Sequence, residues 1–180
     1  MAVAGLAGSG KSEAAAYILK KTGWPSVHFG DTVVNETKAR GLEANQTNER
    51  VVRDEFRKIH GMAAMAIVNL PRIRTHFAEG SVVIESFYSW EEYTTLVEEF
   101  GGKFFVLAIY ANFNLRATRL ANRPTRPLTS DELNARDYSL IETLHQAGPI
   151  ARADFMIINE GSQAELYNKL DAVLARLAQV

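Results

Sequence analysis

A glycine-rich stretch near the start of the chain has the spacing of a phosphate-binding loop. The letters GLAGSGKS, from Gly5 to Ser12, satisfy the pattern G-x-x-x-x-G-K-[ST] and stand between an apolar run and a helix-forming run. Glycines let backbone N–H groups approach phosphate oxygens, and the N-terminus of the following helix adds a partial positive charge. Lys11 would neutralise the β- and γ-phosphates, and the Ser12 hydroxyl would bind Mg²⁺. The residues expected to bind nucleotide here are Gly5, Ala7, Gly8, Ser9, Gly10, Lys11 and Ser12.

Two carboxylates follow apolar runs and would face that loop. Asp31 comes after the run at 26–29, and it could accept the proton of a substrate hydroxyl, orient that hydroxyl, help to hold hydrated Mg²⁺, or cap a helix. Glu85 ends the run at 81–85, where it could support Mg²⁺ through water or pair with an arginine. We predict a catalytic role for Asp31, and a metal-supporting role for both Asp31 and Glu85.

A series of arginines leaves a predicted helix and enters a proline-rich segment. Arg116 and Arg119 share one helical face, whereas Arg123 and Arg126 follow in the segment itself. Guanidinium groups bind phosphate oxygens with two parallel hydrogen bonds, although a solvated helix face explains at least one of the four. We predict that Arg119 and Arg123 contact the nucleotide and, like Lys11, take part in catalysis, with Arg126 and Arg136 as further candidates.

Aromatic and imidazole side chains give weaker signals. Phe87, Tyr88 and Trp90 could line a substrate pocket, but aromatic residues so close to a buried strand more often belong to the core. The histidines have no metal-ligand spacing, and we assign none of them a catalytic role; they are His28, His60, His76 and His145.

A guanine-nucleotide switch is not favoured. The letters NKLD at 168–171 match the guanine-reading pattern, but they fall inside a predicted helix with Leu170 on its apolar stripe. That pattern belongs directly after a strand, and no Asp-x-x-Gly run follows the third predicted strand. We interpret the match as accidental.

Strand-like runs alternate with helical patterns along the whole chain. Strands are predicted at 1–5, 26–29, 81–85, 104–110 and 155–159, and helices near 11–21, 31–41, 46–59, 62–78, 89–99, 112–121, 130–146 and 162–178. Pro71 should kink or interrupt the fourth helix, and Ser162 should cap the last. The alternation predicts a doubly wound α/β fold with a parallel sheet, in which the segments 31–79 and 122–135 lie over the carboxyl edge of the sheet.

Composition narrows the class of protein. The chain has 180 residues, of which 47% are hydrophobic, and its net charge is −1, so we expect one globular domain over 1–180 and no nucleic-acid or membrane partner. The absence of cysteine excludes disulfides and thiol nucleophiles, and together with the lack of a signal sequence it favours a cytoplasmic monomer or homodimer.

The ordered set of motifs resembles a family, the uncharacterised adenylate-kinase-related proteins that are also described as dephospho-CoA-kinase-like P-loop kinases. It consists of GLAGSGKSE (5–13), GD (30–31), RGLE (40–43), HGMAA (60–64), RD (136–137) and ADFMIINEGS (153–162). The resemblance implies a P-loop NTPase fold of the nucleoside-monophosphate-kinase type, a three-layer αβα sandwich with a five-stranded parallel sheet. It also implies a helical acceptor-binding insertion at about 31–79, a lid at about 122–135, ATP and Mg²⁺ as cofactors, and Asn159 among the nucleotide-binding residues.

The chain departs from that family on the acceptor side. Val34 stands where the family often has arginine, and Glu85 to Tyr88 replaces an Asp-Gly-x-Arg run, while the lid is short. We therefore expect an ATP-dependent kinase of a small metabolite, nucleotide or coenzyme precursor, with a hydroxyl-bearing acceptor favoured over a phosphorylated one. The alternatives are an ATP-binding regulatory protein with slow or no phosphoryl transfer and, less favoured, an NTPase without an acceptor.

Overall fold

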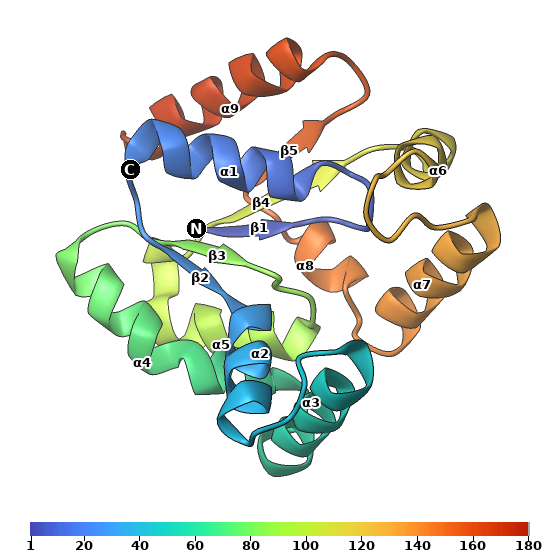
Figure 1. Ribbon diagram of the computed structural model, residues 1–180. Helices are drawn as coiled ribbons and strands as arrows, with labels where there is room; N and C mark the ends of the chain where they lie inside the picture. Colours follow the sequence, from blue (N-terminus) through green and yellow to red (C-terminus); the bar gives the residue numbers. More distant parts are fainter. Residues whose placement is uncertain (180) are drawn as a thin grey trace.

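Five parallel strands form the central sheet of this computed structural model, which describes residues 1–179. The strands are β1 (Ala2–Ala4), β2 (Ser26–His28), β3 (Val83–Glu85), β4 (Val106–Tyr110) and β5 (Phe155–Ile158). Their order across the sheet is β2-β3-β1-β4-β5 (Figure 1). All five predicted strands are confirmed, and each is slightly shorter than the apolar run that predicted it.

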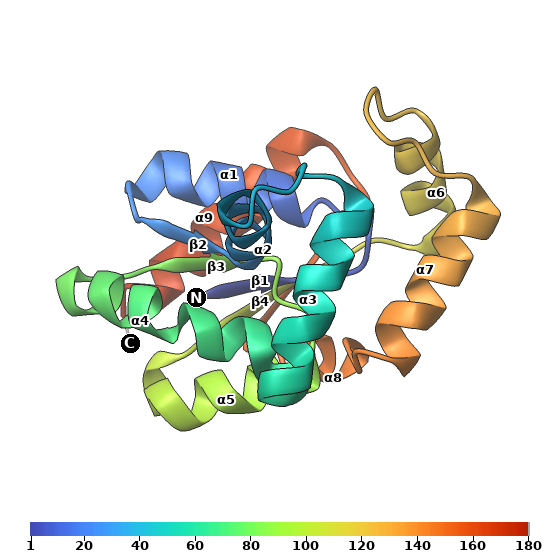
Figure 2. The ribbon, with the colours of Figure 1, turned by 60° about the horizontal axis from the view of Figure 1, so that its bottom comes forward.

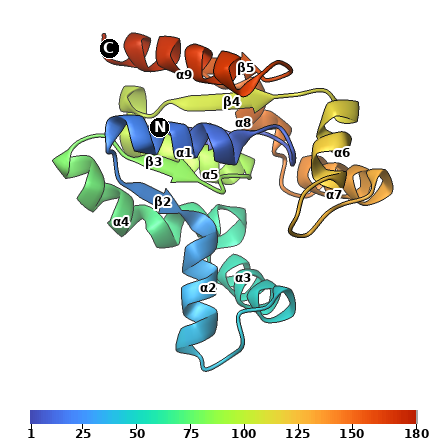
Figure 3. The ribbon, with the colours of Figure 1, turned by 45° about the horizontal axis from the view of Figure 1, so that its top comes forward.

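Helices cover both faces of the sheet and complete a three-layer αβα sandwich. On one face lie α1 (Lys11–Thr22) and α9 (Gln163–Leu177), and on the other lie α4 (Ala64–Glu79), α5 (Trp90–Phe100) and α8 (Ala147–Ala151) (Figures 1 and 3). The three-layer αβα sandwich with a five-stranded parallel sheet, expected from the sequence, is thereby confirmed.

Alternate residues of the central strand β1 serve two separate cores. Ala2 and Ala4 of β1 pack into the core shared with α4 and α5, whereas Val3 between them packs against α1 and α9. Both faces of β1 are therefore buried, which is why this strand reads as a continuous apolar run, whereas the edge strand β5 leaves Met156 and Ile158 exposed. On α9, the predicted stripe is buried at Leu166 and Leu170, and the cap is confirmed because the Ser162 side chain accepts a hydrogen bond from the backbone N–H of Glu165.

Two groups of elements lie beyond the carboxyl edge of the sheet. Between β2 and β3 the chain forms only helices, of which α2 (Phe29–Ala39), α3 (Gln46–His60) and the 3₁₀ turn η1 (Gly61–Ala63) make the first group. Helix α4 instead covers the sheet, so the prediction that 31–79 lies over the carboxyl edge does not hold for α4. After β4 come α6 (Phe113–Ala121) and α7 (Ser130–Glu142), joined by residues 122–129. Figures 2 and 3 show α3 and α7 as two arms beyond the ends of the strands.

The boundaries of three helices differ from the prediction. Helix α2 begins at Phe29, so Asp31 lies in its first turn and does not cap it. The helix predicted over 130–146 ends at Glu142 because the chain turns at His145, whose φ is 53°, before α8 begins. Helix α4 continues through Pro71, which the prediction allowed to interrupt it. In the part of the chain described here, no helix is long and apolar enough to cross a membrane.

Candidate active site

The phosphate loop needs glycine where the chain passes close to its neighbours. Gly10 has φ 99°, and a Cβ atom there would lie 2.2 Å from Asn159 Nδ2. Gly5 has φ 146°, and its Cβ would lie 2.4 Å from the backbone oxygen of Ile109. Any larger residue at either position would be strained and would push the loop off the end of β4 or β5.

Three buried side chains hold the backbone oxygens of this loop. Each donates one hydrogen bond from outside the loop: Gln146 Nε2 to Gly5 O (3.2 Å), Arg116 Nη1 to Ala7 O (3.1 Å) and Asn159 Nδ2 to Ser9 O (2.8 Å). Because the peptide unit is planar and trans, fixing a C=O group in one direction also fixes the direction of the N–H group on the other side of the same peptide. These bonds therefore constrain the orientation of the amides that a phosphate would meet.

Arg116 is part of a buried ion pair beneath the loop. Its Nη2 lies 2.6 Å from Asp137 Oδ2 on α7 and its Nη1 lies 3.1 Å from Oδ1, while Nε donates to the backbone oxygen of Ala111. With the bond to Ala7 O, these contacts engage all three nitrogens of the guanidinium group, and the two bonds to Asp137 have the bidentate form typical of arginine–carboxylate pairs. Arg116 is thus neither on a solvated face nor in the lid, and it links the phosphate loop to α7.

A cleft of about 680 Å³ opens in front of the loop. Lys11 and Ser12 line it from α1, and four arginines line it from the α6–α7 side: Arg119, Arg123, Arg126 and Arg136. All four predicted arginine candidates therefore reach one space. Among the described residues, Arg119 Nη1 is buried without a hydrogen-bond partner. An unpaired guanidinium N–H in a basic cleft is suited to an incoming anion.

The electrostatics of the cleft act on Lys11. Burial, and to a smaller extent the positive charges of Arg136, Arg116 and Arg123, together lower the pKa of its ammonium group to about 8. Its Nζ lies 3.4 Å from the backbone oxygen of Leu6. A bound polyanion would supply the negative charge that this cluster of cations lacks.

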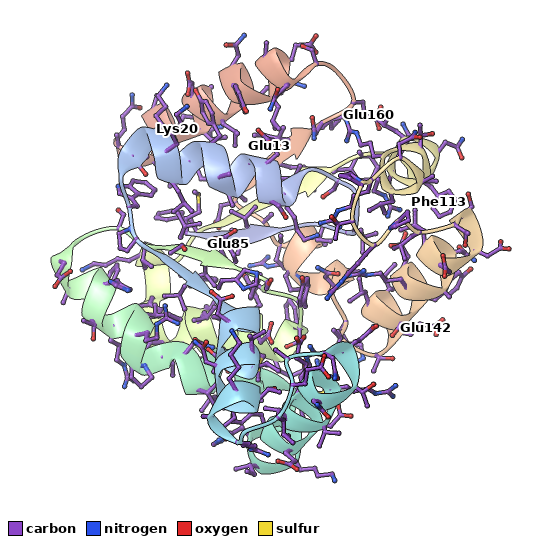
Figure 4. All side chains as sticks on the ribbon, viewed as in Figure 1. Glu13, Lys20, Glu85, Phe113, Glu142 and Glu160 are labelled. Atoms are coloured by element: carbon purple, nitrogen blue, oxygen red, sulfur yellow. The ribbon has the colours of Figure 1, made fainter. Side chains whose placement is uncertain are left out.

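The opposite wall comes from the ends of β2 and β3. His28, Glu85, Ser86 and Tyr88 line it, and Figure 4 labels Glu85 near the centre of the molecule. Ser86 Oγ lies 2.6 Å from His28 Nε2, and His28 Nδ1 lies 2.9 Å from Asp31 Oδ1. Asp31 itself is not among the described residues that line the cleft, and its side chain is 60% exposed. The structure thus places histidine, to which the sequence assigned no role, at the cleft, with the predicted catalytic aspartate behind it.

The structure places the three aromatic candidates in different surroundings. Tyr88 lines the cleft, whereas Phe87 is buried and meets the edge of Phe104 in the core. Trp90 stacks on Tyr93 and lies against Gly148, where no Cβ would fit.

The residues predicted to bind Mg²⁺ are only partly brought together. Ser12 and Glu85 line the same cleft, but Asp31 does not. Within residues 1–179 no group of three or more histidine, aspartate or glutamate side chains is arranged to hold a metal ion. A hydroxyl and one carboxylate fit a Mg²⁺ ion that is held mainly by nucleotide phosphates and water, as is usual for this ion.

Three residues beneath or beside the phosphate loop were either given another role in the sequence analysis or given none. Asn159, predicted to bind nucleotide, is 7% exposed and supports the loop through Ser9 O instead of lining the cleft. Gln146 carried no signal, because it lies in a segment predicted as ordinary helix. Asp137 was visible only as part of the RD pair at 136–137, without a role.

The sequence of this chain is similar to those of known proteins. A family model described as an AAA domain matches residues 4–136. The chain is 32% identical to a UPF0200 protein of Thermococcus gammatolerans, over 97% of this chain and 93% of that one, and 35% identical to a UPF0200 protein of Aeropyrum pernix, over 92% and 87%.

Solved structures show the same fold at lower identity. A gluconokinase from Sinorhizobium meliloti 1021 superposes with a TM-score of 0.61 at 20% identity, covering 99% of this chain and 92% of that one. A shikimate kinase from Aquifex aeolicus has a TM-score of 0.59 at 18% identity, with coverage of 98% and 96%. These likenesses show the fold of P-loop kinases, while the narrower relation to adenylate or dephospho-CoA kinases is an expectation from the motifs. The chain belongs to the AAA domain family and to the UPF0200 family, and it has the fold of P-loop kinases.

Proposed function

We propose that the protein is an ATP-dependent kinase that transfers the γ-phosphoryl group to a hydroxyl of a small metabolite. The observation that carries the proposal is the single cleft in which Lys11 and the constrained loop face four arginines. A hydroxyl-bearing metabolite or a coenzyme precursor of the dephospho-CoA kind falls within this class of reaction, whereas a nucleoside monophosphate would accept the group on a phosphate oxygen and is the alternative acceptor.

The donor side provides the electrostatics that phosphoryl transfer requires. The transferred group carries charge on its equatorial oxygens, and catalysis of such transfer is mostly positioning and charge stabilisation. Lys11 and the loop amides would hold the β- and γ-phosphates, and Arg119 and Arg123 would approach them from the other side. Mg²⁺, when bound near Ser12 and Glu85, would neutralise further phosphate charge.

The acceptor side favours a hydroxyl over a phosphate as the group that is recognised. The wall formed by β2 and β3 carries an imidazole, a carboxylate, a hydroxyl and a phenol, from His28, Glu85, Ser86 and Tyr88. The arginines of the cleft come instead from α6, α7 and the segment between them. Hydrogen-bonding groups without a positive charge suit a polyol or a hydroxy acid better than a phosphate monoester.

Incubation with radiolabelled ATP, Mg²⁺ and a panel of acceptors tests the proposal. The panel contains D-gluconate and shikimate, which the fold relatives suggest, together with AMP and dephospho-CoA, which the motifs suggest. We expect one acceptor to be phosphorylated by the wild-type chain and none by Lys11→Met. The matched control is Lys169→Met on α9, because Lys169 donates to Ile158 O outside the cleft.

A second candidate function is an ATP-binding regulatory protein with slow or no transfer. It is favoured by the two arginines missing from the acceptor side, where Val34 and Tyr88 stand. Tight, Lys11-dependent ATP binding with no phosphorylated product from any acceptor would support this candidate and contradict the kinase.

A further inference from the structure

The ends of β2 and β3 carry a chain of three hydrogen-bonded side chains that points into the cleft. It runs from Ser86 Oγ to His28 Nε2 over 2.6 Å, and from His28 Nδ1 to Asp31 Oδ1 over 2.9 Å. His28 is the last residue of β2 and pairs in register with Glu85, so Ser86 is the next residue along the neighbouring strand. Parallel pairing thus brings residues 58 positions apart into contact.

The backbone is adapted to this contact at two points. Ser86 has φ 58°, a left-handed conformation that is uncommon for a residue other than glycine. Gly30 leaves room for the imidazole, because a Cβ there would lie 2.8 Å from His28 Cε1. With that space open, the ring of His28 folds back over the first turn of α2 and reaches Asp31.

Hydrogen-bond chemistry fixes the state of the neutral ring. The Asp31 carboxylate can only accept, so His28 Nδ1 carries the proton and donates it to Asp31. The lone pair of Nε2 then faces the cleft, where the Ser86 hydroxyl donates to it. A carboxylate that holds a histidine in this tautomer also stabilises the imidazolium that forms when Nε2 takes up a proton.

We propose that His28 is the proton acceptor for the hydroxyl that receives the phosphoryl group, and that Asp31 is the residue that positions it. In this reaction the acceptor oxygen bonds to the γ-phosphorus, the bond from that phosphorus to the leaving ADP oxygen breaks, and the hydroxyl proton moves to His28 Nε2. Ser86 occupies the place of the acceptor hydroxyl until the acceptor binds. The His28 side chain is 39% exposed, so it can then release the proton to water.

This assignment rests on the proposed kinase function and resolves a difficulty within it. Asp31 was the expected base, but it does not line the cleft and its carboxylate is engaged by His28. Glu85 does line the cleft, and its carboxylate is the rival proton acceptor. His28 is the group of this wall that combines a lone pair already accepting from a hydroxyl, an orienting carboxylate on its other nitrogen, and a place in the lining of the cleft that Lys11 shares.

The tautomer is tested without any acceptor. Long-range ¹H–¹⁵N spectra of the full chain, recorded where the rings are neutral and assigned with His28→Gln, should show His28 protonated at Nδ1. In Asp31→Asn the amide can donate to Nδ1, so the proton should move to Nε2. A wild-type His28 protonated at Nε2 would overturn the proposal, whatever the acceptor is.

The proton transfer is tested with the acceptor of highest turnover in the panel. His28→Gln should lower kcat by on the order of 10²–10⁴-fold, the usual contribution of a general base, with the Kd for ATP unchanged. Asp31→Asn should also lower kcat, because His28 would then carry its proton on Nε2 and could not accept the hydroxyl proton there. The matched control is His60→Gln at the exposed end of α3, which should retain full activity.

Three outcomes separate the possible failures. If the wild-type chain phosphorylates no acceptor, the proposed function itself fails. If the wild-type chain is active and His28→Gln is equally active while Glu85→Gln is not, the kinase stands and Glu85 is the base. Phosphate found on Ser86 by peptide mass spectrometry after incubation with ATP would also overturn the assignment, because Ser86 would then be the nucleophile.

Discussion

The two walls of the cleft are held by different kinds of contact. The phosphate loop is fixed from beneath by the buried side chains of Arg116, Gln146 and Asn159, which come from three separate parts of the chain. The strand-end wall is fixed by short hydrogen bonds between His28, Ser86 and Asp31, all of which are partly or largely exposed. A rigid donor wall thus faces an acceptor wall whose geometry depends on a few rotatable side chains.

This difference has a consequence for specificity. A loop held by buried, mutually dependent contacts tolerates little change, whereas exposed side chains on strand ends can change without unfolding the sheet. We infer that nucleotide binding is coupled to the stability of the whole domain, while recognition of the acceptor is not. The following predictions test that separation.

The largest effect is expected from Arg116→Met. The substitution leaves the carboxylate of Asp137 buried without its partner, and breaking a buried ion pair in this way costs about 3–5 kcal/mol in the free energy of unfolding. Urea denaturation measures it. The exposed Arg123→Met should change the same free energy by less than about 0.5 kcal/mol.

Removal of the unpaired Asp137 carboxylate should restore part of the stability that Arg116→Met loses. In the double variant Arg116→Met with Asp137→Leu, no unpaired charge is left in the interior, so stability should rise above that of the single variant. Nucleotide affinity should stay low, because Ala7 O still lacks its donor. If Arg116→Met unfolds at the same urea concentration as the wild type, the loop is not coupled to the domain as described.

A smaller effect is expected from Asn159→Ala. Its loss leaves the backbone oxygen of Ser9 without its buried donor, which costs about 1–3 kcal/mol in the free energy of unfolding. The affinity for ATP should fall as well, because the loop loses one constraint. Calorimetric titration and denaturation on the same samples check both results, and an affinity drop without any loss of stability would place Asn159 at the nucleotide instead of behind the loop.

The phosphate-loop wall of the cleft could be predicted from the sequence to a larger extent than the strand-end wall. The phosphate loop is local, so its eight residues and the helix after it identify it before any fold is known. The arginines of the cleft were predicted for a related reason, since helix period and loop composition place them together. A parallel sheet covered on both faces also followed, because continuous apolar runs alternating with helices indicate buried parallel strands; the order of the strands was not predicted.

The contacts that the sequence could not predict join distant segments. Gln146 reaches Gly5 O only because α8 begins where the predicted long helix breaks. His28 meets Ser86 only through the register of β2 on β3, and a strand of three residues gives no sequence signal for register. For that reason the sequence analysis assigned the catalytic role to Asp31, which does not line the cleft, and assigned none to the imidazole that stands between Asp31 and Ser86.

The pH dependence of nucleotide binding should report on the donor wall. Lys11 has a lowered pKa of about 8, so in the free protein it is protonated below that pH and loses its proton above it. A polyphosphate favours the protonated form, so the affinity for ATP should be level below pH 8 and should fall above it, by up to about tenfold for each pH unit. Lys11→Arg keeps its charge throughout this range and should remove the decline. A wild-type affinity that does not change between about pH 8 and 9 would contradict the lowered pKa.

The smallest effect on stability, and the sharpest test of the acceptor wall, is expected from Gly30→Ala. Gly30 has no positive φ, so alanine fits its backbone in α2 and should change the free energy of unfolding by less than about 1 kcal/mol. The new methyl group displaces the imidazole of His28 from between Asp31 and Ser86. We therefore expect unchanged ATP affinity together with a lower kcat for transfer, measured by calorimetry and by the transfer assay.

Gly41→Ala is the matched control at a glycine with open space around it. Because Gly41 has φ 73°, alanine there is strained and should lower stability without changing kcat. Equal kcat values in the two variants would mean that the position of His28 does not matter for transfer, and the two walls would then differ in construction but not in function.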